Sequence, residues 1–194
     1  GTPIYQGMDI DGIADIGRYD NIFFSPDYWI NSGLPGAPTS QEDKDALKTW
    51  LASDAIAITL RRIDWSYVVF SKIEGYNIGL LMDISYSTEE FENGVRTRYS
   101  YPNGHCYGLT FENCETAVFV RGVSSAGEVL SDITINNCDY GIRYIFDENS
   151  TGGNLQIADS VINANINAIE QDGSSKLSVI STKINGGLVY ANKG

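Results

Sequence analysis

The chain has 194 residues, of which 13 are Lys or Arg and 25 are Asp or Glu, so its formal net charge is -12. This acidic balance argues against a nucleic-acid partner and against docking on an anionic membrane, because both need clustered basic side chains. At 42% hydrophobic and 20% charged residues, the composition is that of a globular domain, and no apolar run approaches the length of a membrane span. We expect one domain over residues 1–194.

The composition favours β-structure with many tight turns. Ile (22) is twice as frequent as Leu (11), and Gly (20) and Asn (15) are abundant. Ile favours strands, whereas Gly and Asn favour left-handed corners. Three cysteines, Cys106, Cys114 and Cys138, are too few for a disulfide framework, and His105 is the single histidine. We therefore expect small buried thiols and no metal site.

In the first half of the chain, residues 22–24 predict a strand and residues 35–38 a Pro- and Gly-containing loop. Residues 39–54 predict an inserted helix, because Thr39 and Glu42 have the spacing of a capping box. This helix would present one apolar face formed by Leu47, Trp50 and Leu51.

Residues 68–73, followed by residues 76–80, predict one further coil of β-structure. A polar, charged and aromatic insertion follows over residues 85–107, and residues 147–153 form a smaller polar loop. Long insertions are where a scaffold usually places its functional residues. The first insertion carries the charged and aromatic side chains Glu89, Glu90, Glu92, Arg96, Arg98, Tyr99 and Tyr101.

The second half contains a repeat of the form apolar-x-apolar-x-polar-small. Its four copies begin 24, 22 and 22 residues apart, at Leu109, Ile133, Leu155 and Leu177. Short alternating strands at such a period are typical of the coils of a parallel β-helix, in which each coil buries its apolar face against the next. We therefore expect these four residues to form one inward column and the residues two positions later to form the next: Phe111, Ile135, Ile157 and Val179.

The same alignment places Asn113 and Asn137 at equivalent corners, where Asn tolerates a left-handed backbone. Cys114 and Cys138 follow them and should stack as reduced, buried neighbours. In this alignment, the cysteine column continues with Ser160 and Thr182.

Four segments resemble bacterial proteins of the pectate-lyase superfamily, including those similar to glycoside hydrolase family 55: residues 12–18, 25–29, 61–65 and 103–108. The resemblance implies an all-β, right-handed parallel β-helix with one inserted α-helix, as a piece of a longer solenoid. The Gly-His-Gly and Arg-Ile-Lys signatures of polygalacturonase-like members are absent, and His105 stands in Asn-Gly-His-Cys instead. No catalytic assignment is therefore transferred from the family.

Charged residues near the ends of two early coils are the candidate catalytic groups, together with the histidine. Asp20 and Asp64 would serve as acid and base in glycoside cleavage, and Arg62 would neutralise a uronate during β-elimination. His105 would be a general base, with Tyr107 or Tyr101 as the acid; the alternative is a histidine in a turn with an ordinary hydrogen bond. The alternative for the charged groups is a structural ion pair between coils.

Alternation over residues 61–65 predicts that Arg62 and Asp64 point outward, that Ile63 and Trp65 lie on the opposite side, and that Asp64 pairs with Arg18 or Arg62. The candidate substrate-binding residues are Arg18, Trp65, Tyr67 and Tyr107; core packing is the alternative for the aromatic ones.

The sequence thus supports two functional hypotheses. The first is a secreted or extracellular carbohydrate-active protein that cuts a polysaccharide or oligosaccharide by hydrolysis or β-elimination. The second is a non-catalytic glycan-binding, adhesion or tailspike-like module. Neither requires a cofactor, although Ca²⁺ held by Asp residues from separate coils stays open. Further coils of a parent protein, or copies of the same chain, are the expected protein partners.

Overall fold

The computed structural model describes residues 1–91, 94–145, 153–172 and 176–191, which are mostly β-strand. The helices are α1 (Asp27–Ile30) and α2 (Gln41–Asp54). The large sheet has the order β1-β4-β7-β12-β14-β11-β6-β3, and β16 and β18 extend it from β14. Its strands are β1 (Gln6–Ile10), β3 (Phe23–Phe24), β4 (Ile56–Leu60), β6 (Lys72–Glu74), β7 (Ile78–Met82), β11 (Thr110–Glu112), β12 (Thr116–Val120), β14 (Thr134–Ile145), β16 (Val161–Asp172) and β18 (Lys183–Ala191).

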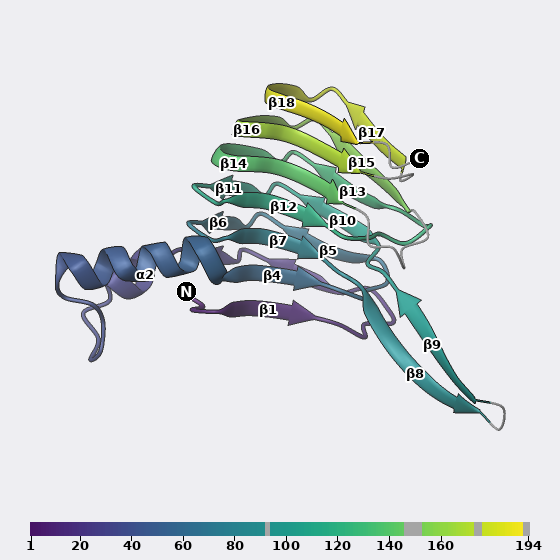
Figure 1. Ribbon diagram of the computed structural model, residues 1–194, viewed down its shortest axis with the longest axis horizontal. Helices are drawn as coiled ribbons and strands as arrows, with labels where there is room; N and C mark the ends of the chain where they lie inside the picture. Colours follow the sequence, from purple (N-terminus) through teal and green to yellow (C-terminus); the bar gives the residue numbers. More distant parts are fainter. Residues whose placement is uncertain (92–93, 146–152, 173–175, 192–194) are drawn as a thin grey trace.

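A six-stranded sheet with the order β17-β15-β13-β10-β5-β2 lies beside the large one. Its strands are β2 (Arg18–Asp20), β5 (Ser66–Val69), β10 (Gly104–Tyr107), β13 (Glu128–Ser131), β15 (Asn154–Ala158) and β17 (Lys176–Ile180). All neighbouring strands in both sheets are parallel. Outside residues 85–100, strands that come later in the chain stack on earlier ones (Figure 1). Most described residues lie in strands, so the prediction of a mostly β fold is confirmed.

Left-handed residues turn the chain from the six-stranded sheet into the large sheet. Their φ angles lie between 48° and 66°, and they are Asn21, Phe70, Gly108, Asp132, Asp159 and Ser181. A second corner, after β11 and within β14, has Asn113 and Asn137 at φ 54°, as the Asn repeat predicts. The short Asn and Asp side chains tolerate this backbone region better than most.

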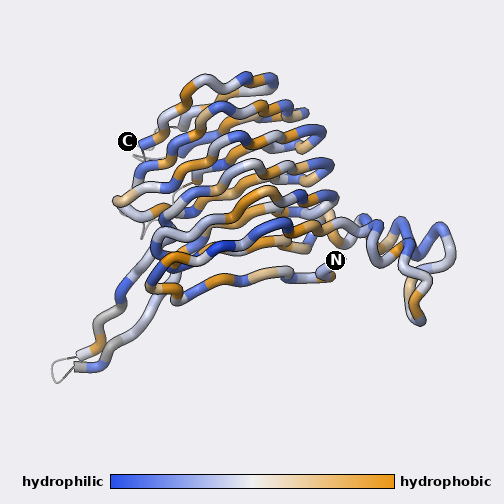
Figure 2. The backbone as a smooth tube through the Cα atoms, turned by 180° about the vertical axis from the view of Figure 1, so that it is seen from behind, coloured by the Kyte–Doolittle hydropathy of each residue, from blue (hydrophilic) through white to orange (hydrophobic). Residues whose placement is uncertain are grey.

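The core lies between the sheets, and apolar and polar segments alternate along the strands (Figure 2). One buried column of the large sheet runs through Ile73, Phe111, Ile135 and Ile162. A column of the six-stranded sheet runs through Val68, Cys106, Leu130, Ile157 and Val179, and all but the last are buried.

The expected continuation of the large-sheet columns is therefore wrong. Phe111 and Ile135 are neighbours as predicted, but Ile157 and Val179 belong to the other sheet. Leu155 and Leu177 also lie there, in register with Glu128 rather than with Ile133. Both sheets bury one face, so the same alternating pattern occurs in each of them.

The thiol prediction is confirmed for the pair itself. Cys114 follows β11, Cys138 lies within its partner strand β14, and both thiols are buried and free. The predicted extension of their column is wrong, because Cys138 is in register with Ala164 of β16. Ser160 instead lies before β16, where its hydroxyl accepts a hydrogen bond from the Ile133 backbone N–H at 3.0 Å.

The predicted helix forms, but it begins one residue later than the capping box indicates. Ser40 is the N-cap, and its Oγ accepts a hydrogen bond from the Asp43 N–H at 3.0 Å. Leu51 is buried and Leu47 packs against the core, whereas the Trp50 ring stays largely exposed. Only the C-terminal part of the helix therefore packs against the core, and the rest of the helix projects from the sheets (Figure 1). No helix in the described residues is long and apolar enough to cross a membrane.

The predicted insertion over 85–107 contains an antiparallel hairpin, β8 (Ser85–Phe91) and β9 (Gly94–Ser100), which projects from the sheets (Figure 1). The insertion ends earlier than expected, because Gly104–Tyr107 forms β10 of the six-stranded sheet. The smaller loop predicted over 147–153 lies outside the described residues except for Gly153.

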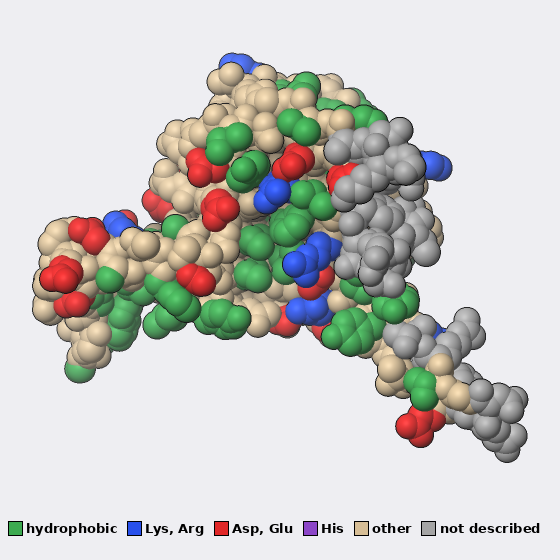
Figure 3. Space-filling view, in the orientation of Figure 1, with side chains coloured by type: hydrophobic (Ala, Val, Ile, Leu, Met, Phe, Trp, Pro, Cys, Tyr) green, Lys and Arg blue, Asp and Glu red, His purple; other side chains and the backbone are tan. Residues whose placement is uncertain are grey.

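Ion pairs cross the strand ends of the large sheet. Arg61 contacts Asp9 at 3.0 Å and Asp83 at 2.9 Å, and Arg121 contacts Asp83 at 3.5 Å. Basic, acidic and hydrophobic side chains are interspersed over this side of the molecule (Figure 3). The pairs join β1, β4, β7 and β12 and leave no concentrated charge of one sign among these residues.

Candidate functional site

The outward face of the six-stranded sheet carries most of the predicted site residues. Arg18 is in register with Tyr67, and Tyr67 with His105, so the three form one column across β2, β5 and β10. Asp20 and Tyr107 belong to the next column, in register with Val69 between them. Neighbouring strands lie about 4.8 Å apart, so these columns bring residues far apart in the sequence onto one surface.

Four rings on this face form what we call the aromatic strip: Tyr67, Phe70, His105 and Tyr107. The ring centroids are 6.4 Å apart for Tyr67 and His105, 6.1 Å for His105 and Tyr107, and 5.3 Å for Phe70 and Tyr107. The side chains of Tyr67, Phe70 and Tyr107 are 36%, 50% and 38% exposed. Core packing is therefore not the role of Tyr67 or Tyr107.

His105 lies in the middle of the strip and is half-buried. Its Nε2 lies 2.6 Å from the Ser131 Oγ on the neighbouring strand β13. Burial lowers the pKa of His105 from its usual value, because it disfavours the charged imidazolium. The ring is therefore neutral at neutral pH, and one of its nitrogens is an acceptor.

Arg18 and Asp20 lie at the edge of the strip and bind each other. The Arg18 Nε is 2.6 Å from the Asp20 Oδ2, and both side chains are exposed. The hydrogen bond that Arg18 donates to the Asp20 carboxylate, and the negative charge of that carboxylate, raise the pKa of Arg18. The structure thus brings Asp20 together with Arg18 and not with Asp64.

The remaining predicted residues lie at the corner before β5. The Arg62 Nη2 is 3.6 Å from the Asp64 Oδ2, so Asp64 has one of its two expected partners. The Asn103 amide donates to the Asp64 Oδ1 at 3.1 Å and accepts from the Trp65 N–H at 2.8 Å. Ile63 is buried as predicted, but Trp65 is 58% exposed. Its φ of 56° interrupts the expected alternation.

We expect Asp64→Asn to change the free energy of unfolding by less than about 1 kcal/mol. The side chains of Arg62 and Asp64 are 46% and 37% exposed, so solvent screens the pair. Asn retains an oxygen that accepts from the Asn103 amide. Urea denaturation of both proteins checks this value, and a loss near the 3–5 kcal/mol of a broken buried pair would contradict the exposed geometry.

The base of the hairpin forms a polar cleft of about 540 Å³, lined by Asp11, Gly12, Arg62, Ser85, Ser87, Arg98 and Ser100. Asp11 holds the cleft together: its carboxylate accepts from the backbone N–H groups of Gly12 and Arg62 and from the Ser85 hydroxyl. Arg98 of the predicted insertion lines this cleft, whereas the side chain of Arg96 lies outside the described ones.

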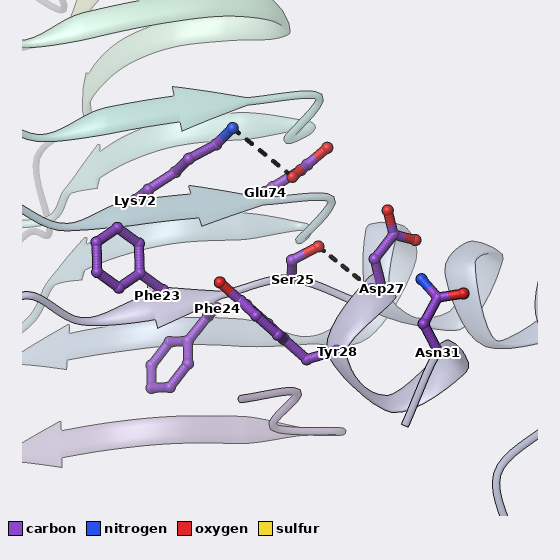
Figure 4. A pocket seen from close by; sticks show the side chains of 8 residues that line it. All are labelled: Phe23, Phe24, Ser25, Asp27, Tyr28, Asn31, Lys72 and Glu74. Atoms are coloured by element: carbon purple, nitrogen blue, oxygen red, sulfur yellow. Dashed lines mark hydrogen bonds and ion pairs between the residues drawn. The ribbon is translucent and has the colours of Figure 1, made fainter. Parts of the chain in front are cut away.

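Sequence reasoning missed a second pocket, which lies between α1, β3 and β6 (Figure 4). It is lined by Phe23, Phe24, Ser25, Asp27, Tyr28, Asn31, Lys72 and Glu74 and has a volume of about 410 Å³. Residues 23–31 are rich in aromatic and polar side chains, and this is the sequence signal that could have indicated a pocket. Nothing in the sequence shows that these residues lie beside residues 72–74.

Within the described residues, no three His, Cys, Asp or Glu side chains gather closely enough to hold a metal ion. The sequence matches no protein-family model and no curated protein, and the fold matches no solved structure. The function is therefore inferred from the geometry of the aromatic strip, the polar cleft and the pocket beside α1.

Proposed function

We propose that the chain is a right-handed parallel β-helix of the pectate-lyase type. The in-register parallel pairing of successive strands supports this architecture. The recurring left-handed residues between the two sheets support it further, because each one turns the chain at the same point of a coil. In such a fold, the outward columns form long surfaces with a spacing of about 4.8 Å.

On this scaffold, we infer that the protein binds an extracellular polysaccharide along the aromatic strip. The observation that carries the inference is the exposure of Tyr67, Phe70 and Tyr107 as neighbouring rings on one sheet face. The C–H groups of a sugar carry partial positive charge and pack favourably on the negative face of an aromatic ring. Arg18, at the edge of the strip, supplies hydrogen-bond donors to sugar oxygens.

We expect Tyr67→Ala and Tyr107→Ala each to weaken polysaccharide binding about tenfold, because each removes one stacking surface. Affinity electrophoresis in gels containing neutral or uronate polysaccharides measures the effect. Tyr86→Ala is the matched control, because Tyr86 is an exposed tyrosine on the hairpin, outside the strip. If the strip variants were retarded as strongly as the wild type in every gel, the proposal would fail.

The second candidate function is cleavage of the bound polysaccharide, and the position of His105 favours it. A neutral imidazole between two tyrosines is able to accept a proton beside a uronate carboxylate. Incubations with the same polysaccharides distinguish the candidates. Unsaturated uronates would indicate β-elimination and new reducing ends without them hydrolysis, whereas binding without either product favours a non-catalytic module.

A further inference from the structure

The pocket beside α1 has the size and rigidity of a small-molecule site. Its volume of about 410 Å³ lies within the range of ligand pockets. Ser25 is 7% exposed, and its Oγ accepts from the Asp27 N–H at 3.2 Å. The Thr2 hydroxyl donates to the Ser25 carbonyl at 2.6 Å and accepts from the Trp29 N–H at 3.0 Å. These bonds fix α1 against β3, so the walls are preformed.

Two partly exposed aromatic rings line this hollow. Phe23 is 45% exposed and Tyr28 is 53% exposed. Tyr28 extends from α1 back toward β3, while Phe23 projects from β3 itself (Figure 4). Asn31 adds an amide, which both donates and accepts hydrogen bonds. The lining therefore combines apolar faces with polar groups at the rim.

The charges around the pocket disfavour ionic ligands of either sign. Lys72 contacts Glu112 at 2.6 Å and Glu74 at 3.9 Å, and Lys48 contacts Asp27 at 3.1 Å. Three carboxylates thus face two ammonium groups, and this excess of negative charge repels uronates, sulfates and phosphates. A cationic ligand would meet the Lys72 ammonium, which already occupies the position between Glu74 and Glu112.

We propose that this pocket binds one uncharged pyranose ring, as a carbohydrate site separate from the aromatic strip. The ring of Tyr28 or Phe23 contacts the C–H face of the sugar. The carboxylates of Asp27 and Glu74 accept hydrogen bonds from sugar hydroxyls, and the Asn31 amide and the Lys72 ammonium donate to sugar oxygens. The inference depends on the pocket lining alone and not on the function proposed for the strip.

Saturation-transfer difference NMR on the whole chain tests the site. The probes are the methyl glycosides of glucose, galactose and mannose, with those of glucuronic and galacturonic acid as charged counterparts. We expect at least one neutral glycoside to give a signal that depends on Tyr28, and the uronates to give no Tyr28-dependent signal. Tyr28→Ala should weaken the neutral ligand about tenfold, whereas Tyr28→Phe, which keeps the ring, should retain most of the binding.

Tyr86→Ala serves as the control, because Tyr86 lies on the hairpin and lines neither the pocket nor the aromatic strip. It should leave the monosaccharide signal unchanged. The strip proposal is tested with polysaccharides and at Tyr67 and Tyr107, so its failure and the failure of this proposal are separable. Tyr28 is largely exposed, so the alanine variant should keep the wild-type melting temperature. Three results would each overturn the proposal: no neutral glycoside binds, uronates give an equal signal that depends on Tyr28, or a folded Tyr28→Ala protein keeps its affinity for the neutral glycoside.

Discussion

Glu128→Gln is expected to make the protein more stable above pH 8 and to remove most of the fall in stability between pH 4.5 and pH 8. Glu128 is 1% exposed and lies on the inward face of β13. Its Oε1 accepts a hydrogen bond from the Cys106 thiol at 3.5 Å, and its Oε2 has no hydrogen-bond partner among the described residues. Burial raises the pKa of this carboxyl from 4.5 to about 8, because the interior disfavours the charged form.

The direction of the effect follows from proton binding. Between pH 4.5 and pH 8, the unfolded chain has lost the Glu128 proton while the native protein keeps it, so unfolding releases a proton. Stability therefore decreases as the pH rises through this window and levels off above it. The span of the shift corresponds to a loss on the order of 5 kcal/mol. Glutamine has a similar shape and is neutral at every pH. The free energy of unfolding of the variant therefore does not decrease in this way as the pH rises.

Urea unfolding of both proteins at intervals from pH 4 to pH 9 measures the difference. The two curves should nearly coincide at the acidic end and separate steadily toward pH 8. Other titrating groups contribute equally to both proteins, so the difference reports Glu128 alone. Parallel curves would mean that Glu128 is ionised and hydrated in the native state.

Residue alternation predicts which side chains point inward, but not which sheet they belong to. The copies at Leu109 and Ile133 are strands of the large sheet, whereas those at Leu155 and Leu177 belong to the six-stranded sheet. The true partner of Ile135 is Ile162, 27 residues later, because the chain between β14 and β15 is lengthened. A sequence alignment cannot detect this exchange, since each sheet buries one face and has the same period of two.

Most of the aromatic strip was predictable from the phase of strands β5 and β10, whereas Phe70 follows β5 at a left-handed corner. Tyr67 and Tyr107 alternate with the apolar residues Val68 and Cys106, so their outward direction follows from the pattern. The burial of Glu128 was not predicted, although Glu128 and the apolar Leu130 point to the same side of their strand. A carboxylate in that position is normally assigned to the surface, because an ionised buried group is so costly. The pocket beside α1 could not be predicted, because β3 and β6, which line it, are brought together only by the tertiary fold.

Phe111→Ala is expected to lower the free energy of unfolding by about 3–5 kcal/mol. Phe111 is fully buried in the large-sheet column, between Ile73 and Ile135. Its ring also fills the space over Gly79: a Cβ atom there would lie 2.5 Å from the Phe111 Cδ1. Truncation removes contacts with both strands and leaves a cavity, which the rigid ladder on either side is unable to close.

Phe70→Ala is the matched control, because it deletes the same atoms from a ring that is 50% exposed. We expect it to cost no more than about 1.5 kcal/mol, mainly through its edge-to-face contact with Tyr107. Differential scanning calorimetry of the two variants compares the losses directly. Equal losses would place Phe111 outside the core column and contradict its register with Ile135. A large loss for Phe111 alone would locate the main stabilising contacts between the stacked strands, leaving the exposed rings of the strip free for a ligand.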